Sequence, residues 1–249
     1  MSTSGCEGAG LLIGTSGWFY KIWKDDFYEG VAQKRWLSHY ASRFNSVEVN
    51  ATFYRLQKPA TYEKWLGQTP DSFCFTVKGS RFVTHIKRLK DTKDSIIKQK
   101  DNLEILLPRL AAVVWQLPGN MEKDLSRLED FAASLSIHWP RNHHVMEFRN
   151  SSWFDQDVAG LLDKYNLANC LSDSPNWHMW EMTLSGLAYV RLHGHTELYR
   201  SEYTEKQLSS WAGKAGHWKD QGLKVFIFFD NTDENHAWND ALRLKEMLG

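Results

Sequence analysis

Three pairs of side chains that could carry chemistry stand two residues apart where apolar runs of the sequence end. The pairs are Glu48 with Asn50, Glu147 with Arg149, and Arg191 with His193. Residues i and i+2 of an extended strand point to the same face, so both members of a pair share a side. Carboxylates and imidazole transfer protons, and guanidinium groups bind carboxylate or phosphate through paired hydrogen bonds. The pattern predicts catalysis by Glu147, Glu48 and His193 beside an anion-binding site.

Other apolar runs also end in polar or aromatic residues. We expect substrate binding by Lys78, Arg149, Arg191, Asn50, Trp18, Gln116, Asp173 and Asn231. Three cations in this set favour an anionic ligand, and the aromatic residue offers a stacking face for a sugar or nucleobase. The alternative for each charged residue is a structural ion pair, such as Glu147 with Arg191. For Lys78 the alternative is a side chain at the rim whose amine reaches water.

Metal-dependent and glycosidase chemistry fit this pattern less well. Glu48, Glu147, Asp173, His193 and His85 could supply metal ligands, but the interleaved Arg and Lys oppose a bound cation and no H-E-x-x-H spacing occurs. We therefore expect no metal and no other cofactor. A glycosidase needs two carboxyl groups roughly 5 to 9.5 Å apart, whereas strands carrying Glu48 and Glu147 would lie almost across a barrel.

Eight short apolar runs, typical of parallel strands buried on both faces, must position these residues. They are 11–15, 46–50, 73–78, 112–117, 144–148, 168–172, 188–192 and 224–229. Helical patterns separate them at 32–44, 94–110, 123–135, 156–165, 204–221 and 234–248. The interval at 61–66 allows only a short helix, and 173–186 is too short for a full crossover. Eight such units predict a TIM-like (β/α)8 barrel with one or two crossover helices short or missing, and an open doubly wound sheet is the alternative.

Length and composition limit the remaining possibilities. The 249 residues suit one barrel domain over 1–249, with 1–10 as a loose N-terminal tail. Lys plus Arg and Asp plus Glu both number 30, so no global field favours DNA or a membrane surface, and any nucleic-acid role would need a local basic patch. The three cysteines, with no C-x-x-C spacing, predict no disulfide and a reducing compartment. Without an apolar segment of membrane-spanning length or a secretion signal, we expect a cytoplasmic protein with no membrane partner.

Five ordered motifs resemble the YecE-like family, a domain of unknown function (DUF72). They are Gly14-Thr15-Ser16-Gly17-Trp18, the stretch 47–55, Thr84-His85, Glu147-Phe148-Arg149 with Ser152-Trp153, and the stretch 189–194. The resemblance extends from about Leu11 to Leu248. It implies a (β/α)8-like barrel with these motifs at its mouth and implies no established reaction. Phe229-Asp230-Asn231 departs from the family pattern, in which two Asn residues are more common.

The function expected from these observations is that of an enzyme, a hydrolase, lyase or isomerase, acting on a phosphorylated sugar or nucleotide-like ligand. A small anionic molecule is the expected partner. One alternative is a nucleic-acid-binding or metal-dependent endonuclease-like barrel, and another is a non-catalytic ligand sensor. The sequence does not indicate the substrate or the oligomeric state.

Overall fold

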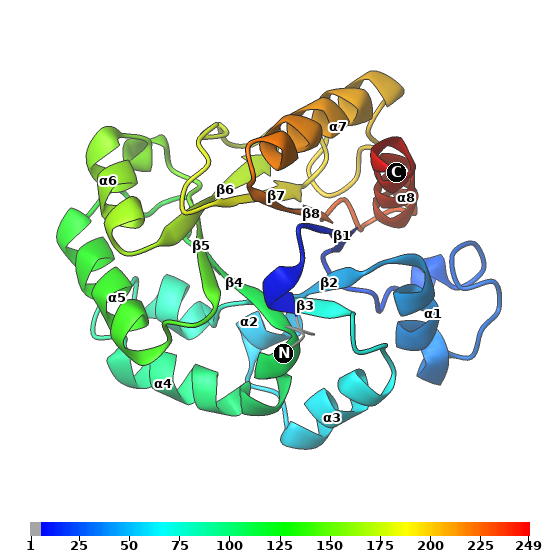
Figure 1. Cartoon of the computed structure of the whole chain (residues 1–249), viewed down its shortest axis with the longest axis horizontal. Coiled ribbons are helices and arrows are strands. Elements are labelled where there is room, and N and C mark those ends of the chain that lie inside the picture. Colours follow the sequence, from blue (N-terminus) through cyan, green and yellow to red (C-terminus); the bar gives the residue numbers. More distant parts are fainter. Residues whose placement is uncertain (1–5) are drawn as a thin grey trace.

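A computed structural model describes residues 6–249, in which eight parallel strands form a nearly closed barrel surrounded by helices (Figure 1). The strands are β1 (Leu11–Thr15), β2 (Ser46–Val49), β3 (Cys74–Lys78), β4 (Leu110–Gln116), β5 (His143–Glu147), β6 (Leu167–Asp173), β7 (Leu187–Leu192) and β8 (Lys224–Phe229). Each strand pairs with its sequence neighbour from β2 to β8, and β8 pairs with β1. The predicted barrel is therefore confirmed.

Helices follow the strands on the outside of the barrel (Figure 1). The α-helices are α1 (Trp36–Arg43), α2 (Ala51–Tyr54), α3 (Pro59–Gly67), α4 (Lys93–Asn102), α5 (Leu125–His138), α6 (Gln156–Lys164), α7 (Glu205–Asp220) and α8 (His236–Leu248). Short turns are η1 (Cys6–Gly8), η2 (Lys21–Trp23), η3 (Gln33–Arg35), the π-helix η4 (Phe82–Ile86), η5 (Glu104–Arg109) and η6 (Ser151–Trp153). Among the residues described, no helix has the length and apolar character needed to cross a membrane.

The β6–β7 connection differs from the others because it contains no helix. Residues 174–186 form turns and irregular backbone, as expected from the short interval. Helix α3 spans nine residues, which fits the prediction of one short crossover. The β6–β7 segment brings the aromatic side chain of Trp177 to the ends of the strands, where it contacts Arg149.

Two apolar layers stabilise the barrel. The larger lies between strands and helices and includes Trp23, Trp115 and Trp153, all fully buried. The smaller fills the barrel interior, where Tyr189, Phe226 and Phe228 are fully buried. Because apolar side chains fill the interior, the barrel is a packed core, and polar groups lie at the carboxyl ends of its strands.

Side chains close the one gap in the barrel, between β1 and β2, where only the bridge from Ser16 to Glu48 pairs backbone. The Tyr40 hydroxyl accepts from the Thr15 amide at 2.8 Å and donates to the Ser46 carbonyl at 3.1 Å. The Asn45 side chain accepts from the Ile13 amide at 3.0 Å and donates to the carbonyl of Leu11 at 2.8 Å. These two side chains supply the hydrogen bonds that a regular ladder would have made.

Gly14 permits this close approach of β1 to β2. A Cβ at this position would lie 2.2 Å from the Ser46 carbonyl oxygen, a distance at which backbone would have to move. Gly14, the first glycine of the Gly14-Thr15-Ser16-Gly17-Trp18 motif, therefore has a packing role at the barrel seam.

The expectation of no disulfide is wrong, because Cys6 and Cys74 are joined by a disulfide. The two residues are 68 apart in sequence, so the spacing gave no indication that η1 packs against the start of β3. Residues 1–5 of the expected loose tail lie outside the described residues, whereas Cys6 is buried and bonded. The expectation of a reducing compartment rested on the absence of a disulfide and loses that support. Cys170 is a free, buried thiol.

Candidate functional site

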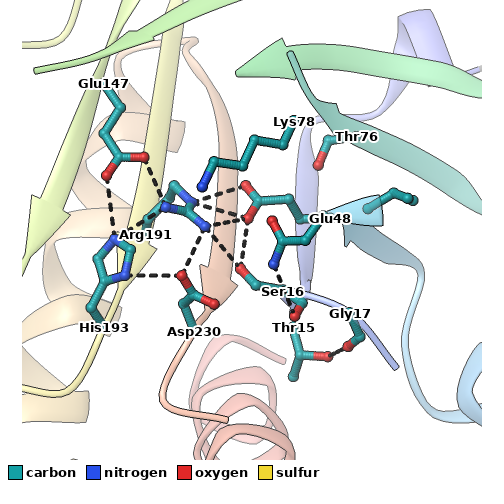
Figure 2. A network of polar contacts seen from close by, with 12 residues as sticks. Thr15, Ser16, Gly17, Glu48, Thr76, Lys78, Glu147, Arg191, His193 and Asp230 are labelled. Carbon is teal, nitrogen blue, oxygen red and sulfur yellow. Dashed lines mark hydrogen bonds and ion pairs between the residues drawn. The ribbon is translucent and has the colours of Figure 1, made fainter. Parts of the chain in front are cut away.

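Arg191, on β7, is fully buried at the centre of a polar cluster at the carboxyl ends of the strands (Figure 2). Its guanidinium donates to Glu48 at 2.7 Å, Glu147 at 2.8 Å and Asp230 at 2.8 Å. Burial disfavours the charged guanidinium, but these carboxylates outweigh it and raise the pKa of Arg191 well above its ordinary value. One cation thus joins residues from β2, β5 and the segment after β8.

Glu48 has both carboxylate oxygens occupied. Oε1 accepts from the Ser16 hydroxyl at 2.6 Å and from Arg191, and Oε2 accepts from the Tyr189 hydroxyl at 2.6 Å. Tyr189 stands two residues before Arg191 on β7 and shares its inward face. Burial raises the pKa of Tyr189 well above its ordinary value, so its hydroxyl stays a donor.

Glu147 is fully buried between two arginines. Oε1 accepts from Arg149 Nε at 2.8 Å, and Oε2 accepts from Arg191 Nη1. Burial opposes ionisation of Glu147, but Arg149 and Arg191 prevail and hold its pKa well below the usual range. The guanidinium carbon of Arg149 lies 4.0 Å from the ring centroid of Trp177, which belongs to the β6–β7 segment. The terminal nitrogens of Arg149 donate to no acceptor among the described residues.

His193 and Asp230 form the side of the cluster that follows β7 and β8. His193 Nε2 lies 3.3 Å from Arg191 Nη1, and because a guanidinium only donates, this ring nitrogen accepts. The Nδ1 of His193 lies 3.0 Å from Asp230 Oδ2. Burial opposes ionisation of Asp230, but Arg191 and His193 outweigh it and lower its pKa to about 2. Oδ1 of Asp230 has no donor among the described residues, and Figure 2 shows it without a contact.

Lys78, at the end of β3, brings a second cation to the cluster. Burial, followed by the charge of Arg191, lowers its pKa from 10.5 to about 8. Its ammonium lies 4.3 Å from the Phe53 ring centroid, and among residues 6–249 it has no hydrogen bond and no ion pair. Figure 2 shows this side chain directed toward Arg191. Lys78 is therefore a cation available to a ligand.

His85 and Gln116 lie beside Lys78. Burial and then the charge of Lys78 lower the pKa of His85 to about 4, so its ring is neutral at pH 7. Its Nδ1 lies 2.9 Å from the Thr84 hydroxyl, and Nε2 lies 3.5 Å from Gln116 Nε2. The β3–β5 side of the mouth carries the positive charges of Lys78 and Arg149. The β8 side carries Oδ1 of Asp230, which has no donor among the described residues.

Four of the residues expected to bind substrate lie at the edge of this cluster or outside it. Asp173 accepts from the Tyr203 hydroxyl at 2.8 Å. Asn231 donates to the carbonyl of Ser201 and to Asp240, and thus fastens the segment after β8 to α8. Trp18 packs edge-on against Trp65 beside the mouth. Asn50 donates to the Ser16 carbonyl at 3.4 Å.

Three residues of the cluster had no catalytic or binding role assigned from the sequence, although one of them, Asp230, counted among the carboxylates expected at the mouth. Ser16, Tyr189 and Asp230 each contact Glu48 or Arg191 directly. Tyr189 could have been found because it shares a strand face with Arg191, and Asp230 because it directly follows an apolar run. Nothing in the sequence showed that Ser16 would be the bridge across the β1–β2 gap.

Metal-binding side chains are not grouped in the described part of the chain. Within residues 6–249, no three His, Cys, Asp or Glu side chains are placed so that they could hold one metal ion together. The carboxylates of the mouth are instead directed at Arg191 and Arg149.

The fold and the cluster define a class: parallel α/β barrels with an ionised polar centre at the carboxyl ends of the strands. The chain belongs to a family within that class, "Protein of unknown function DUF72", whose model matches residues 12–249. It is 24% identical to the UPF0759 protein YunF of Bacillus subtilis, over 96% of this chain and 94% of that protein. It is 34% identical to the UPF0759 protein YecE of Escherichia coli K12, over 47% of this chain and 43% of that protein.

Solved structures of the same family share the fold. A DUF72 family protein of Thermotoga maritima superimposes with a TM-score of 0.84 and 26% identity, covering 96% of this chain and 98% of that one. A DUF72 family protein of Enterococcus faecalis gives a TM-score of 0.80 at 15% identity, covering 96% and 95%. The family resemblance stated from the sequence is therefore confirmed.

Proposed function

We propose that this protein is an enzyme acting on a small molecule with an anionic group, such as a phosphorylated sugar or a nucleotide. The observation that carries the proposal is that the Lys78 ammonium, near the buried Arg191, has no hydrogen bond and no ion pair within residues 6–249. A largely buried ammonium without a hydrogen bond or ion pair loses hydration without compensation, so it costs free energy in the folded protein. Such a cost is typical of groups retained for a ligand. Arg149, with two unoccupied terminal nitrogens, is the second anion-binding group.

The remaining groups divide into those that hold the site and one that reaches the ligand. We expected Glu48, Glu147 and His193 to transfer protons, but their oxygens and ring nitrogens are directed at Arg191, Arg149 and Asp230. In the proposal these residues fix the positions of the two arginines. We expected Arg191 to bind the anion; with three carboxylates around it, its proposed role is to hold them together.

Asp230 is the proposed group that accepts a hydrogen bond from a ligand hydroxyl. Its Oδ1 is unoccupied, its side chain is 11% exposed, and a pKa of about 2 keeps it ionised at neutral pH. A ligand with its anionic group on Lys78 and Arg149 would place its polar body toward this oxygen. Trp177, stacked on Arg149, would lie over the ligand and exclude water.

The proposal is tested by thermal unfolding in the presence of phosphate, sugar phosphates and nucleotides. A ligand that binds only the folded state at about 100 times its Kd adds roughly 2.7 kcal/mol, which raises Tm by about 5 °C or more in a protein of this size. Lys78→Met should abolish the rise, and Lys78→Arg should retain part of it. Lys219→Met, on the exposed face of α7, is the matched control. A rise that is equal in Lys78→Met and wild type, or no rise with any anion, would refute the proposed anion site.

A further inference from the structure

Exposed large apolar side chains gather on one part of the molecule. Of the six among the described residues, five lie in segments that follow β1, β2 and β3: Phe19, Ile22, Tyr54, Phe82 and Ile86, exposed by 46 to 69%. We call residues 17–35, 50–67 and 79–93 the β1–β3 rim. Because the three strands are neighbours at the β1–β2 seam and in the β2–β3 ladder, the segments after them are neighbours at the mouth. Exposed apolar side chains concentrated in one region are typical of an interaction surface.

The same rim is basic, although the whole chain is neutral. Its three segments, 17–35, 50–67 and 79–93, contain twelve Lys and Arg against five Asp and Glu. None of these twelve is in an ion pair with a carboxylate of the described chain. In all but one of the ion pairs found there, the basic partner lies between Lys123 and Arg243, the exception being Arg43 with Glu29. The unpaired cations are therefore concentrated where the exposed aromatic rings are.

Shallow grooves join the aromatic and basic groups of the rim. One of about 340 Å³ is lined by Trp18 and Phe19 together with Lys34, Lys58 and Lys64. A second of about 280 Å³ is lined by Leu56, Phe82 and Lys98. A third of about 310 Å³ adjoins the first at Gln33 and is lined by Lys21, Lys24 and Trp36. No carboxylate lines any of the three.

The rim continues into the mouth. Tyr54 lies 5.1 Å from Phe53, measured between ring centroids, and Phe53 lies 5.1 Å from His85. Phe53 also lies beneath the ammonium of Lys78. A chain of anionic groups on the rim would thus end next to the available cation of the site.

We propose that the β1–β3 rim binds single-stranded nucleic acid. Unpaired bases can stack on Phe19, Tyr54 and Phe82, while lysines between these rings neutralise the backbone phosphates. In a duplex the bases are stacked on each other and cannot use the rings. An acidic polypeptide would use the lysines but gains little from exposed aromatic faces. The combination of both features favours the single strand.

The experiment is fluorescence anisotropy with labelled oligothymidylate and oligouridylate of about 12 nucleotides, within the range of sites bound by single-strand-binding modules. Saturable binding is expected, stronger than to a duplex of the same length. The logarithm of the affinity should fall linearly with the logarithm of salt concentration, with a slope of about −0.7 for each phosphate contacted. Polyglutamate is the competitor that represents an acidic polypeptide.

Variants at exposed positions separate stacking from charge. Tyr54→Ala should weaken binding about tenfold, in the range for loss of one base–aromatic stack, whereas Tyr54→Phe should not. Lys58→Glu with Lys64→Glu should weaken binding and make the salt dependence less steep. Lys206→Glu with Lys219→Glu on α7 changes the net charge equally and is the matched control.

Three outcomes would overturn the proposal: no saturable binding at about 50 mM salt, equal weakening by the control pair, or displacement by polyglutamate with Tyr54→Ala unchanged. The last would assign the surface to an acidic polypeptide. Because Lys78 is not among the variants, failure here leaves the proposed anion site untouched, and failure of the anion site leaves this test valid.

Discussion

Arg191 shows how a single buried cation can organise a site. Its guanidinium holds Glu48, Glu147 and Asp230 within 2.8 Å, so removing it takes a hydrogen-bonded cation away from three buried carboxylates at once. Truncating one member of a buried ion pair costs about 3–5 kcal/mol because the remaining charge stays uncompensated. The residue is thus required for the fold whatever its role in the reaction.

We therefore predict that Arg191→Met lowers the free energy of unfolding by at least about 3–5 kcal/mol, measured by urea denaturation. Arg200→Met is the matched control, because Arg200 is half exposed and pairs with exposed Glu197 and Glu234. The control should change stability by less than about 1 kcal/mol. Equal effects of the two substitutions would show that the buried network contributes no more than a surface ion pair.

Lys78 should have the opposite effect on stability. Its folded pKa of about 8 lies below the ordinary 10.5, so the unfolded chain binds more protons between these values and stability rises with pH there. Below pH 8 the ammonium is charged in both the folded and the unfolded chain, so the free-energy cost of burying it does not change with pH. Lys78→Met should raise the free energy of unfolding at pH 7 by roughly 1–3 kcal/mol, allowing for partial exposure.

The measurement is urea denaturation of wild type and Lys78→Met between pH 7 and 10.5. The difference between the two proteins should shrink as pH rises above 8. Lys206→Met, at an exposed position, should show neither the gain nor the pH dependence. If Lys78→Met is less stable than wild type at pH 7, the ammonium is not an uncompensated charge, and the observation that carries the proposed function is lost.

Sequence reasoning identified most of these residues but not the relations between them. The i, i+2 spacing showed that Arg191 shares a face with His193, and by the same rule with Tyr189. Sequence reasoning offered the Glu147–Arg191 ion pair as an alternative, and the structure contains that pair, but it could not show that Arg191 also contacts Glu48, because that contact depends on side-chain length and on barrel closure. Roles assigned from residue type alone, such as proton transfer by Glu48, depend on which oxygens remain unoccupied, and only side-chain geometry gives this.

At the scale of elements, the seam between β1 and β2 determines whether the barrel closes. The Tyr40 hydroxyl serves two buried backbone groups across the seam, the Thr15 amide and the Ser46 carbonyl. Leaving each of these without a partner costs about 1–3 kcal/mol. Tyr40→Phe should therefore lower the free energy of unfolding by roughly 2–4 kcal/mol and speed hydrogen exchange at the Thr15 amide.

Tyr54→Phe is the control for this substitution, because the Tyr54 hydroxyl lies on an exposed side chain and forms no hydrogen bond in the described chain. It should leave stability unchanged within about 0.5 kcal/mol. Unchanged exchange at Thr15 in Tyr40→Phe would mean that the side chain does not close the seam.

The strands were predictable because their apolar runs are short, β-rich and spaced by about 30 residues. The predicted runs at 11–15 and 224–229 match β1 and β8 to the residue. The seam was not predictable, since the apolar periodicity of α1 places Tyr40 on the buried face but does not show that its hydroxyl joins two strands, and Asn45 lies beyond the helix. An open doubly wound sheet, the alternative expected from the sequence, would reverse its strand order part-way across the sheet, whereas here the strands follow sequence order and β8 pairs with β1.

At the scale of the whole molecule, the net charge is zero, but unpaired basic side chains are concentrated in one part of the chain. The basic side chains of residues 51–93 have no carboxylate partners in the described chain, while those after residue 122 are largely paired. Composition therefore gave a correct total and an incomplete account of the surface. What decides partner choice is the local excess, because at physiological salt charges farther apart than about 8 Å are screened from one another.

The disulfide between Cys6 and Cys74 joins the N-terminal segment to the start of β3. In the chain-entropy account, a cross-link over 68 residues stabilises by about 4 kcal/mol, because it restricts the unfolded chain, and removing a native disulfide typically costs about 2–5 kcal/mol. Reduction with dithiothreitol, or Cys6→Ser, should lower Tm by about 5–15 °C. Thiol titration of denatured, unreduced protein should find one free thiol, Cys170, and after reduction three. Dithiothreitol should have no further effect on Cys6→Ser, since Cys170 forms no disulfide. Three thiols in the unreduced protein, with a Tm that ignores the reductant, would show that this bond does not form in solution.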